Sequence, residues 1–285
     1  MKTYIVAVSG GVDSVVLLDK MARRGTNSEY IVAHVDHGIR SDSRDDAQFV
    51  ETLAKNYDCE FVSTSLALGE NASEEQARKA RYAWLQDVQA RYNAEAIVTA
   101  HHEDDVLETL CINLLRGTGW RGLCSLRDHA SLRRPLLHLS KAEIVRYAIE
   151  HELVWRDDST NQSPHYLRNY VRMLYIPKLS NEQRRQLVQL YASQCKIADD
   201  ISPAITQALA ASRAGQGLSR YFLIMAGYDV AREIVRAWVD SSFESKSMLR
   251  LWHFICTARI GKRLHENGRD FCVSRDELIV SPPHI

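Results

Sequence analysis

A turn built from two glycines and two serines near the N-terminus limits the folds open to this chain more than any other segment: Ser9-Gly10-Gly11-Val12-Asp13-Ser14. The run before it, Tyr4–Val8, is apolar and β-branched, as in a strand buried in a parallel sheet. The segment after it has helical spacing, with Val15 and Leu18 on one face. Free N–H groups, hydroxyls and the positive end of the helix dipole would then meet at the turn, which predicts a phosphate-binding site.

The turn lacks the Gly-Lys-Ser/Thr ending of a Walker loop. The pattern Ser-Gly-Gly-x-Asp-Ser after a first strand instead resembles the pyrophosphate loop (PP-loop) of the N-type ATP pyrophosphatases, which split ATP into AMP and pyrophosphate. The alternative is a tight strand-to-helix turn whose glycines only allow close packing. Such a turn does not require two serines and an aspartate, so we favour the phosphate site.

Strand-like and helix-like segments alternate through the first hundred residues. Strands are predicted at Tyr4–Val8, Tyr30–Val35, Glu60–Ser65 and Ala96–Ala100, and helices at 14–24, 43–57, 73–92 and 103–115. Further along, a short extended segment is predicted at 134–137, and the spacing of Ser140 and Glu143 matches a capping box, which predicts that another helix starts there. This alternation predicts an α/β fold with a Rossmann-like, doubly wound parallel sheet. Ligands of such sheets bind beyond the carboxyl ends of the strands, so the residues after each strand are the candidates for function.

Polar residues follow the second predicted strand. Val35 and Asp36 would lie at the same sheet edge as Ser9 and Asp13. An aspartate there can hold Mg²⁺ on ATP or accept a proton from an attacking amine. The plainer alternative for Asp36 is a turn or helix-capping residue, and we favour the functional reading.

Two histidines and several carboxylates follow the fourth predicted strand, and three readings of them are open. His101 and His102 together with Asp104, Asp105 and Glu108 have the composition of a metal site. Acids in a first helical turn also complement the helix dipole without any ligand. We prefer a third reading, in which these groups support a divalent ion that arrives with ATP.

Arginines are the remaining candidates for phosphate or RNA contacts. Arg116 can pair with a phosphate because its guanidinium is always charged and binds in two places at once. Arg78 and Arg81 are spaced to share a helical face, which is more often a solvated stripe. The group Arg168, Asn169 and Arg172 lies beside a polar loop over 155–161, which suits RNA contact; caps and surface charges are the alternative.

The second part of the chain has a different pattern. Helices are predicted from 180 to about 199, over 220–239 and over 245–263, with a hairpin around a turn within 271–280. We therefore predict two domains, an ATP-using domain at 1–180 and a smaller, mostly helical domain at 181–285.

Composition narrows the function classes. Apolar residues make up 45% and charged residues 25% of the chain, and no apolar run reaches the length of a membrane span. The absence of a signal-peptide pattern makes a cytoplasmic location the expectation. The net charge of zero hides an asymmetry, because residues 1–120 hold 12 Lys and Arg against 19 Asp and Glu, whereas 121–285 hold 24 against 17. The basic part suits a polyanion-binding surface, although a chance imbalance fits equally well.

The motifs also occur together in one order across residues 9–172, and this ordered set resembles the tRNA(Ile)-lysidine synthases. They are Ser-Gly-Gly-Val-Asp-Ser, His-Val-Asp-His-Gly-Ile-Arg, Ala-Arg-x-x-Arg-Tyr, His-His-x-x-Asp-Asp-x-x-Glu-Thr, Leu-Leu-Arg-Gly-Thr-Gly-x-x-Gly-Leu, Arg-Pro-Leu-Leu and Asp-x-Thr-Asn followed by Arg-Asn-x-x-Arg. The resemblance implies ligation of free lysine to C2 of the wobble cytidine in a CAU anticodon of tRNA(Ile), with ATP and Mg²⁺, and it leaves a homodimer open.

The resemblance also implies roles for individual residues. Ser9 to Ser14 would hold the phosphates, Asp36 and Glu143 would orient and deprotonate the lysine amine, and Arg116 would stabilise charge on the α-phosphate. His101 and Asp105 would support the pocket or the Mg²⁺, for which Asp13 and Asp36 are candidate ligands, and no dedicated metal site is expected. On this resemblance the mostly helical domain at 181–285 would contact tRNA. Longer family members carry a further C-terminal domain for which 285 residues leave little room.

Rival readings are a tRNA-thiolating relative, which the scattered cysteines disfavour, and a non-catalytic RNA-binding relative. The intact pyrophosphate loop argues against the second, and ATP consumption that depends on lysine and tRNA would separate it from the synthase reading.

Overall fold

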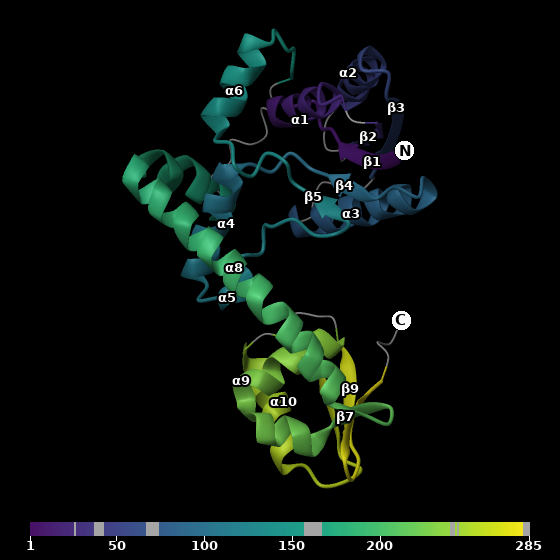
Figure 1. Cartoon of the computed structure of the whole chain (residues 1–285), viewed down its shortest axis with the longest axis vertical. Coiled ribbons are helices and arrows are strands. Elements are labelled where there is room, and N and C mark those ends of the chain that lie inside the picture. Colours follow the sequence, from purple (N-terminus) through teal and green to yellow (C-terminus); the bar gives the residue numbers. More distant parts are fainter. Residues whose placement is uncertain are drawn as a thin grey trace. The chain divides into compact units, whose positions relative to one another are not determined.

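The computed structural model of the chain describes residues 1–25, 27–36, 43–66, 74–156, 167–239, 243 and 245–281. The chain forms two compact units, Met1–Cys195 and Lys196–Ile285, and the division falls within one long helix, α8 (Asn181–Ala211) (Figure 1). In the part of the chain that is described, no helix combines the length and apolar character that a membrane span needs.

The first unit is organised by a parallel sheet with the strand order β3-β2-β1-β4-β5. Its strands are β1 (Lys2–Ala7), β2 (Ser28–Asp36), β3 (Glu60–Ser65), β4 (Ala96–Val98) and β5 (Leu132–Arg133). The chain runs outward from β1 to β3 and then returns to place β4 on the other side of β1. The order of the strands therefore reverses between β1 and β4, the point where doubly wound sheets open a crevice for ligands.

Alternate residues of the central strands supply two hydrophobic cores on opposite faces of the sheet. Val6 and Val32 pack with α1 (Val12–Ala22), α2 (Ser43–Asn56) and α6 (Lys141–Glu150) on one face. Ile5 and Ile31 pack with α3 (Glu74–Arg91) on the other (Figure 1). The predicted α/β class and doubly wound sheet are confirmed.

Helix α4 (Glu103–Leu115) leaves the carboxyl end of β4 and is held by segments from later in the chain. Leu107 and Ile112 pack against Val171 and Ile176, and also against the start of α8. The supporting segments are α5 (Trp120–Leu123), α7 (Leu167–Tyr170), a π-helical turn at Val171–Tyr175 and a 3₁₀ turn at Ile176–Lys178. The first turn of α4 is therefore fixed beside the PP-loop edge of the sheet.

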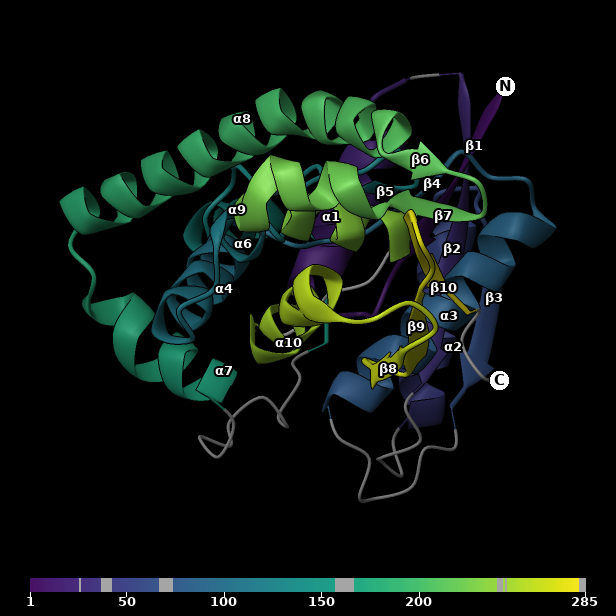
Figure 2. The same cartoon turned by 90° about the horizontal axis from the view of Figure 1, so that it is seen from below.

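The second unit has its own antiparallel sheet, of order β6-β7-β10-β9-β8 (Figure 2). Its strands are β6 (Arg213–Ala214), β7 (Gly217–Ser219), β8 (Arg263–Glu266), β9 (Arg269–Val273) and β10 (Glu277–Val280). Leu218, Phe271 and Leu278 form a core with α9 (Arg220–Val239) and α10 (Ser245–Thr257). The hairpin predicted at 271–280 is confirmed as β9 and β10.

Element bounds follow the prediction closely in the first unit and less closely in the second. β3 and α4 have the predicted bounds, and β4 is two residues shorter. α9 spans the predicted residues, but its backbone is not helical at Gly227 (φ +77°, ψ +167°), so two helical segments meet there at a kink. The prediction that the last helix reaches residue 263 is wrong, because α10 ends at Thr257. Gly261, with φ of +82°, then allows the chain to turn into β8. The helix predicted to end near 199 continues to Ala211. The extended segment predicted at 134–137 lies two residues earlier, as β5.

Candidate functional site

The PP-loop closes on itself through its two serines. The Ser14 hydroxyl donates to the Gly11 carbonyl (2.8 Å) and accepts from the Ser9 N–H (3.2 Å). The Ser9 hydroxyl lies 3.3 Å from Ser14 Oγ and accepts from the Gly11 N–H at 3.4 Å. Gly11 is the N-cap of α1 and has no side chain to cap it. The first-turn amides and the helix dipole therefore face an opening that suits an anion.

Arg156, from much later in the chain, holds the PP-loop through its backbone. Gly10 has φ of +93°, and its carbonyl accepts a hydrogen bond from the Arg156 N–H at 3.0 Å. The Arg156 guanidinium lies 3.4 Å from Asp46 and over the ring of Phe49, which also lines Gly10. Sequence reasoning assigned the 155–161 loop to RNA contact and missed this bracing role of Arg156; residues 157–161 lie outside the described part of the chain.

Asp36 is the last residue of β2 and accepts a hydrogen bond from the Ser65 hydroxyl at 3.3 Å. The Val8 N–H donates to the Ala33 carbonyl, which extends the β1–β2 pairing up to the start of the PP-loop. Val35 and Asp36 therefore lie at the edge from which the loop departs, as predicted. The residues that follow, 37–42, are outside the described part.

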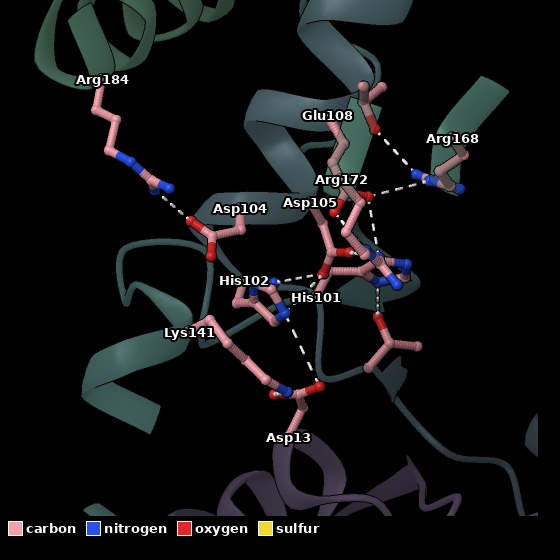
Figure 3. Close-up of polar contacts among 12 residues, drawn as sticks. Asp13, His101, His102, Asp104, Asp105, Glu108, Lys141, Arg168, Arg172 and Arg184 are labelled. Carbon is pink, nitrogen blue, oxygen red and sulfur yellow. Dashed lines mark hydrogen bonds and ion pairs between the residues drawn. The ribbon is translucent and has the colours of Figure 1, made fainter. Parts of the chain in front are cut away.

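The start of α4 and the start of α6 meet the PP-loop at Asp13 (Figure 3). Lys141 Nζ lies 2.6 Å from Asp13 Oδ1, and His102 Nε2 lies 3.8 Å from Asp13 Oδ2. His102 is the N-cap of α4, and its backbone N–H donates to Asp105 at 3.0 Å. Sequence reasoning included His102 only as one of the two histidines after the fourth strand, and it missed Lys141, which lies outside every motif that pointed to the site.

Asp105 and Glu108 face two arginines, Arg168 of α7 and Arg172 of the π-helical turn that follows it (Figure 3). The Arg172 guanidinium donates to both oxygens of Glu108 (2.5 and 2.9 Å) and to Asp105 (3.2 Å). Arg168 Nε lies 3.5 Å from Glu108, and its guanidinium donates to the Thr109 hydroxyl at 3.0 Å. Arg168 and Arg172 were predicted to bind tRNA; their contacts here give them a structural role, and the tRNA contact stays a prediction, as it does for Asn169.

Burial and neighbouring charges set opposite pKa shifts on the two carboxylates. Burial raises the pKa of Glu108 above its ordinary value, even though Arg172 opposes the shift. Burial also acts to raise the pKa of Asp105, but the neighbouring His102, the hydrogen bond from the His102 N–H and the charge of Arg172 outweigh it, so that this pKa is lowered. Asp105 is therefore the more firmly ionised of the pair.

His101 lies on the opposite side of the cluster from Lys141 and is uncharged at neutral pH. Burial, assisted by the charges of Arg134, Arg78 and Arg81, lowers the pKa of His101 to about 3. Its Nδ1 is 2.9 Å from the Thr99 hydroxyl. The predicted residues Arg78 and Arg81 therefore do belong to the surroundings of the predicted residue His101.

Glu143 lies in the first turn of α6, where the predicted capping box with Ser140 is confirmed. One Glu143 oxygen accepts from the Ser140 N–H (2.8 Å) and hydroxyl (2.7 Å). These hydrogen bonds lower the pKa of Glu143, so the group is a carboxylate at neutral pH. The negative charge of Glu143 in turn helps to raise the pKa of Glu103 in the first turn of α4. The Glu103 N–H donates to the carbonyl of Leu139, just before α6.

Arg116 is placed differently from the other predicted residues. It is the C-cap of α4, at the opposite end of this 13-residue helix from His102. A rise of 1.5 Å per residue separates the two ends by roughly 20 Å. The structure therefore brings Asp13, Asp105, His101 and Glu143 to one edge and leaves Arg116 away from it; its role at the α-phosphate stays a prediction.

The cluster does not have the donors of a resident metal centre. Among the described residues, no three His, Cys, Asp or Glu side chains gather in a way that could hold a metal ion. The carboxylates of α4 are instead engaged by arginines, as described above. A divalent cation would fit here only if phosphate oxygens completed its coordination, which suits an ion carried by a nucleotide.

A doubly wound sheet with a turn rich in glycine and serine after its first strand, at the point where the strand order reverses, is typical of nucleotide-binding α/β proteins. Residues 1–179 match the family model described as "PP-loop domain". The chain therefore belongs to the PP-loop family.

Curated relatives extend this likeness. A protein named tRNA(Ile)-lysidine synthase from Solibacter usitatus is 36% identical over 196 residues, which cover 68% of this chain and 44% of that protein. One with the same name from Haemophilus ducreyi is 33% identical over 261 residues, covering 88% of this chain and 57% of that protein. The chain spans about half the length of these relatives.

A solved structure agrees in fold. The U34-tRNA thiolase NcsA from Methanococcus maripaludis, with its [4Fe-4S] cluster, superposes with a TM-score of 0.57 at 18% identity, covering 70% of this chain and 73% of that one. At this identity the likeness shows the fold alone.

Proposed function

We propose that this protein ligates lysine to C2 of the wobble cytidine in the CAU anticodon of tRNA(Ile). The cytidine carbonyl oxygen would attack the α-phosphate of ATP, releasing pyrophosphate and leaving an adenylated base. The lysine ε-amine would then attack C2, and AMP would leave with that oxygen. The observation that carries the proposal is the PP-loop beside Asp36 and Glu143 in a chain whose curated relatives are named for this reaction.

The loop is suited to the leaving pyrophosphate. Uncapped amides at the start of α1 and the hydroxyls of Ser9 and Ser14 would stabilise the charge that develops on the pyrophosphate. Mg²⁺ would enter with ATP, with Asp13 and Asp36 as its protein ligands. ATP supplies the activating group, and the chain supplies its position.

Two carboxylates are suited to the lysine amine. The lowered pKa of Glu143 makes it a fixed negative charge that can hold an ammonium group. Asp36, at the loop edge of β2, would accept the proton that the amine must lose before it attacks. The neutral His101 would line the pocket as a hydrogen-bonding group without adding charge.

The basic excess of the second half of the chain lies mainly in the first unit. Residues 121–195 hold 12 Lys and Arg against 7 Asp and Glu, whereas 196–285 hold 12 against 10. Much of the attraction for tRNA would therefore come from the PP-loop unit itself.

The second unit offers one surface suited to RNA. A pocket of about 1030 Å³ between α10 and β8 is lined by aromatic side chains, including Trp252, and by cations, including Arg259 and Lys262. Among the described residues that line it there is no Asp or Glu. Stacking faces next to phosphate-binding cations are the combination that binds single-stranded or looped RNA.

Transfer of radiolabelled lysine onto purified tRNA, with ATP present, tests the proposal. We expect label on a CAU-anticodon isoleucine tRNA and none on initiator methionine tRNA, with loss of label in Asp36→Ala. Asp87→Asn, an exposed acid on α3, is the control and should retain activity. ATP split to AMP and pyrophosphate without label on either tRNA would keep the PP-loop chemistry and exclude lysidine formation.

A further inference from the structure

We propose that Lys141 is a phosphate-binding residue of the ATP site, and that its ion pair with Asp13 is the nucleotide-free arrangement of that site. On binding, the ammonium would pass from the Asp13 carboxylate to the β- or γ-phosphate of ATP, while Asp13 turns to the accompanying cation. The proposal rests on the ATP-using part of the proposed function and not on the identity of the acceptor.

The position of the ammonium carries the argument. Lys141 Nζ is 2.6 Å from a carboxylate in the first turn of α1, whose N-terminus closes the PP-loop (Figure 3). Both side chains are partly exposed, at 41% for Lys141 and 31% for Asp13. The pair is therefore open to an incoming ligand, and a phosphate bound at the loop would lie within reach of the same ammonium.

Local helix energetics do not account for a lysine at this position. Lys141 is the first residue of α6, where the helix dipole disfavours a cation. The capping of α6 is complete without it, because Ser140 and Glu143 form the capping box. The charge of Lys141 is therefore unfavourable for its own helix. Its favourable interaction is the ion pair with Asp13 of α1.

Docking of α6 does not account for the pair either. Ile144 and Ala148 of α6 are fully buried in the core that they share with α1. The Tyr147 hydroxyl donates to the buried Asp19 of α1 at 2.7 Å. These contacts join the two helices more firmly than a partly exposed ion pair can. Lys141 is therefore available to exchange its partner without loss of the fold.

Equilibrium binding of Mg²⁺·α,β-methylene-ATP to the full chain, measured by calorimetry, tests the proposal without any acceptor. We expect Lys141→Met to weaken binding about ten- to a hundred-fold, the range for losing a charged hydrogen bond. Lys141→Arg should recover most of that loss. Lys55→Met is the matched control, because Lys55 makes an equally short pair with Glu51 (2.7 Å) on α2, and it should bind like the unmodified protein. Unchanged binding by Lys141→Met would overturn the proposal.

A double-mutant cycle with Asp13→Asn separates phosphate binding from mere restraint of Asp13. If Lys141 binds phosphate, Lys141→Met still weakens nucleotide binding about ten-fold or more in the Asp13→Asn background. If Lys141 only orients Asp13, the effect disappears in that background and the proposal is wrong. Failure of lysine transfer, with the nucleotide results as expected, would remove the proposed acceptor and leave this inference standing. A chain that binds no nucleotide would remove both.

Discussion

Two ion pairs lie near the start of α4, and they differ mainly in how far the carboxylate is exposed. In one, Arg172 (38% exposed) binds Glu108, whose side chain is 1% exposed. In the other, Lys141 (41% exposed) binds Asp13, which is 31% exposed. Breaking a buried pair leaves an uncompensated charge, whereas an exposed pair contributes little to stability. The comparison teaches that the buried pair holds the site in place and that the open pair can take part in binding.

The largest expected effect comes from breaking the buried pair. We expect Arg172→Met to lower the free energy of unfolding by about 3 kcal/mol, the low end for a broken buried pair, because Glu108 loses its bidentate partner but keeps Arg168 at 3.5 Å. Urea denaturation measures this directly. Arg185→Met, which breaks an exposed pair with Glu182 (70% and 61% exposed), is the control and should cost less than about 1 kcal/mol. Full stability with weakened tRNA binding in Arg172→Met would instead favour the RNA-contact reading of this residue.

The pH dependence of stability gives an intermediate effect from the same buried side. The pKa of His101 is lowered to about 3 in the folded chain, against an ordinary 6.5. Between these values the unfolded chain binds one more proton than the folded chain, so stability falls as pH falls below 6.5. The slope is about 1.4 kcal/mol per pH unit, or about 3 kcal/mol between pH 6.5 and 4.

The measurement is urea denaturation of the unmodified protein and of His101→Gln at several pH values in this window. The variant should show a flatter dependence by about that slope. Parallel pH profiles for the two proteins would mean that the folded protein does not hold His101 neutral, and that water reaches its side chain.

The smallest expected effect is on the open side. Lys141→Met should change the free energy of unfolding by no more than about 1 kcal/mol, because a partly exposed ion pair is solvated when broken. The same urea experiment measures it next to Arg172→Met. A loss above about 2 kcal/mol would show that Lys141 ties α6 to α1, and the contrast between the two pairs would no longer hold.

The sequence was sufficient for the parts of the fold that depend on local pattern. The alternation of apolar strands with helical stretches located β3 and α4 to the residue, and the Ser140 to Glu143 spacing predicted the start of α6. The PP-loop could be recognised because its chemistry lies within six consecutive residues.

The sequence could not show which charged side chains form ion pairs with one another in the folded protein. Arg172 stands next to a polar loop in the chain, which suggested RNA, but it reaches Glu108, 64 residues earlier, in the folded protein. Lys141 looked like one residue of a capping box, and only the meeting of α6 with α1 shows its contact with Asp13. Arg116 was grouped with the site from the resemblance, whereas the length of α4 sets it apart.

Asp19 lies at the other end of α1 from its N-cap, with 0% of its surface exposed. It accepts hydrogen bonds from Arg23, from Tyr57 at the end of α2 and from Tyr147 of α6. One carboxylate thus joins three elements into a preorganised frame before any ligand arrives. The chain loses the conformational entropy of this frame when it folds. A ligand at the loop would therefore bind without a further loss of entropy from ordering these elements. Affinity for nucleotide in this protein should accordingly depend on a side chain that no nucleotide touches.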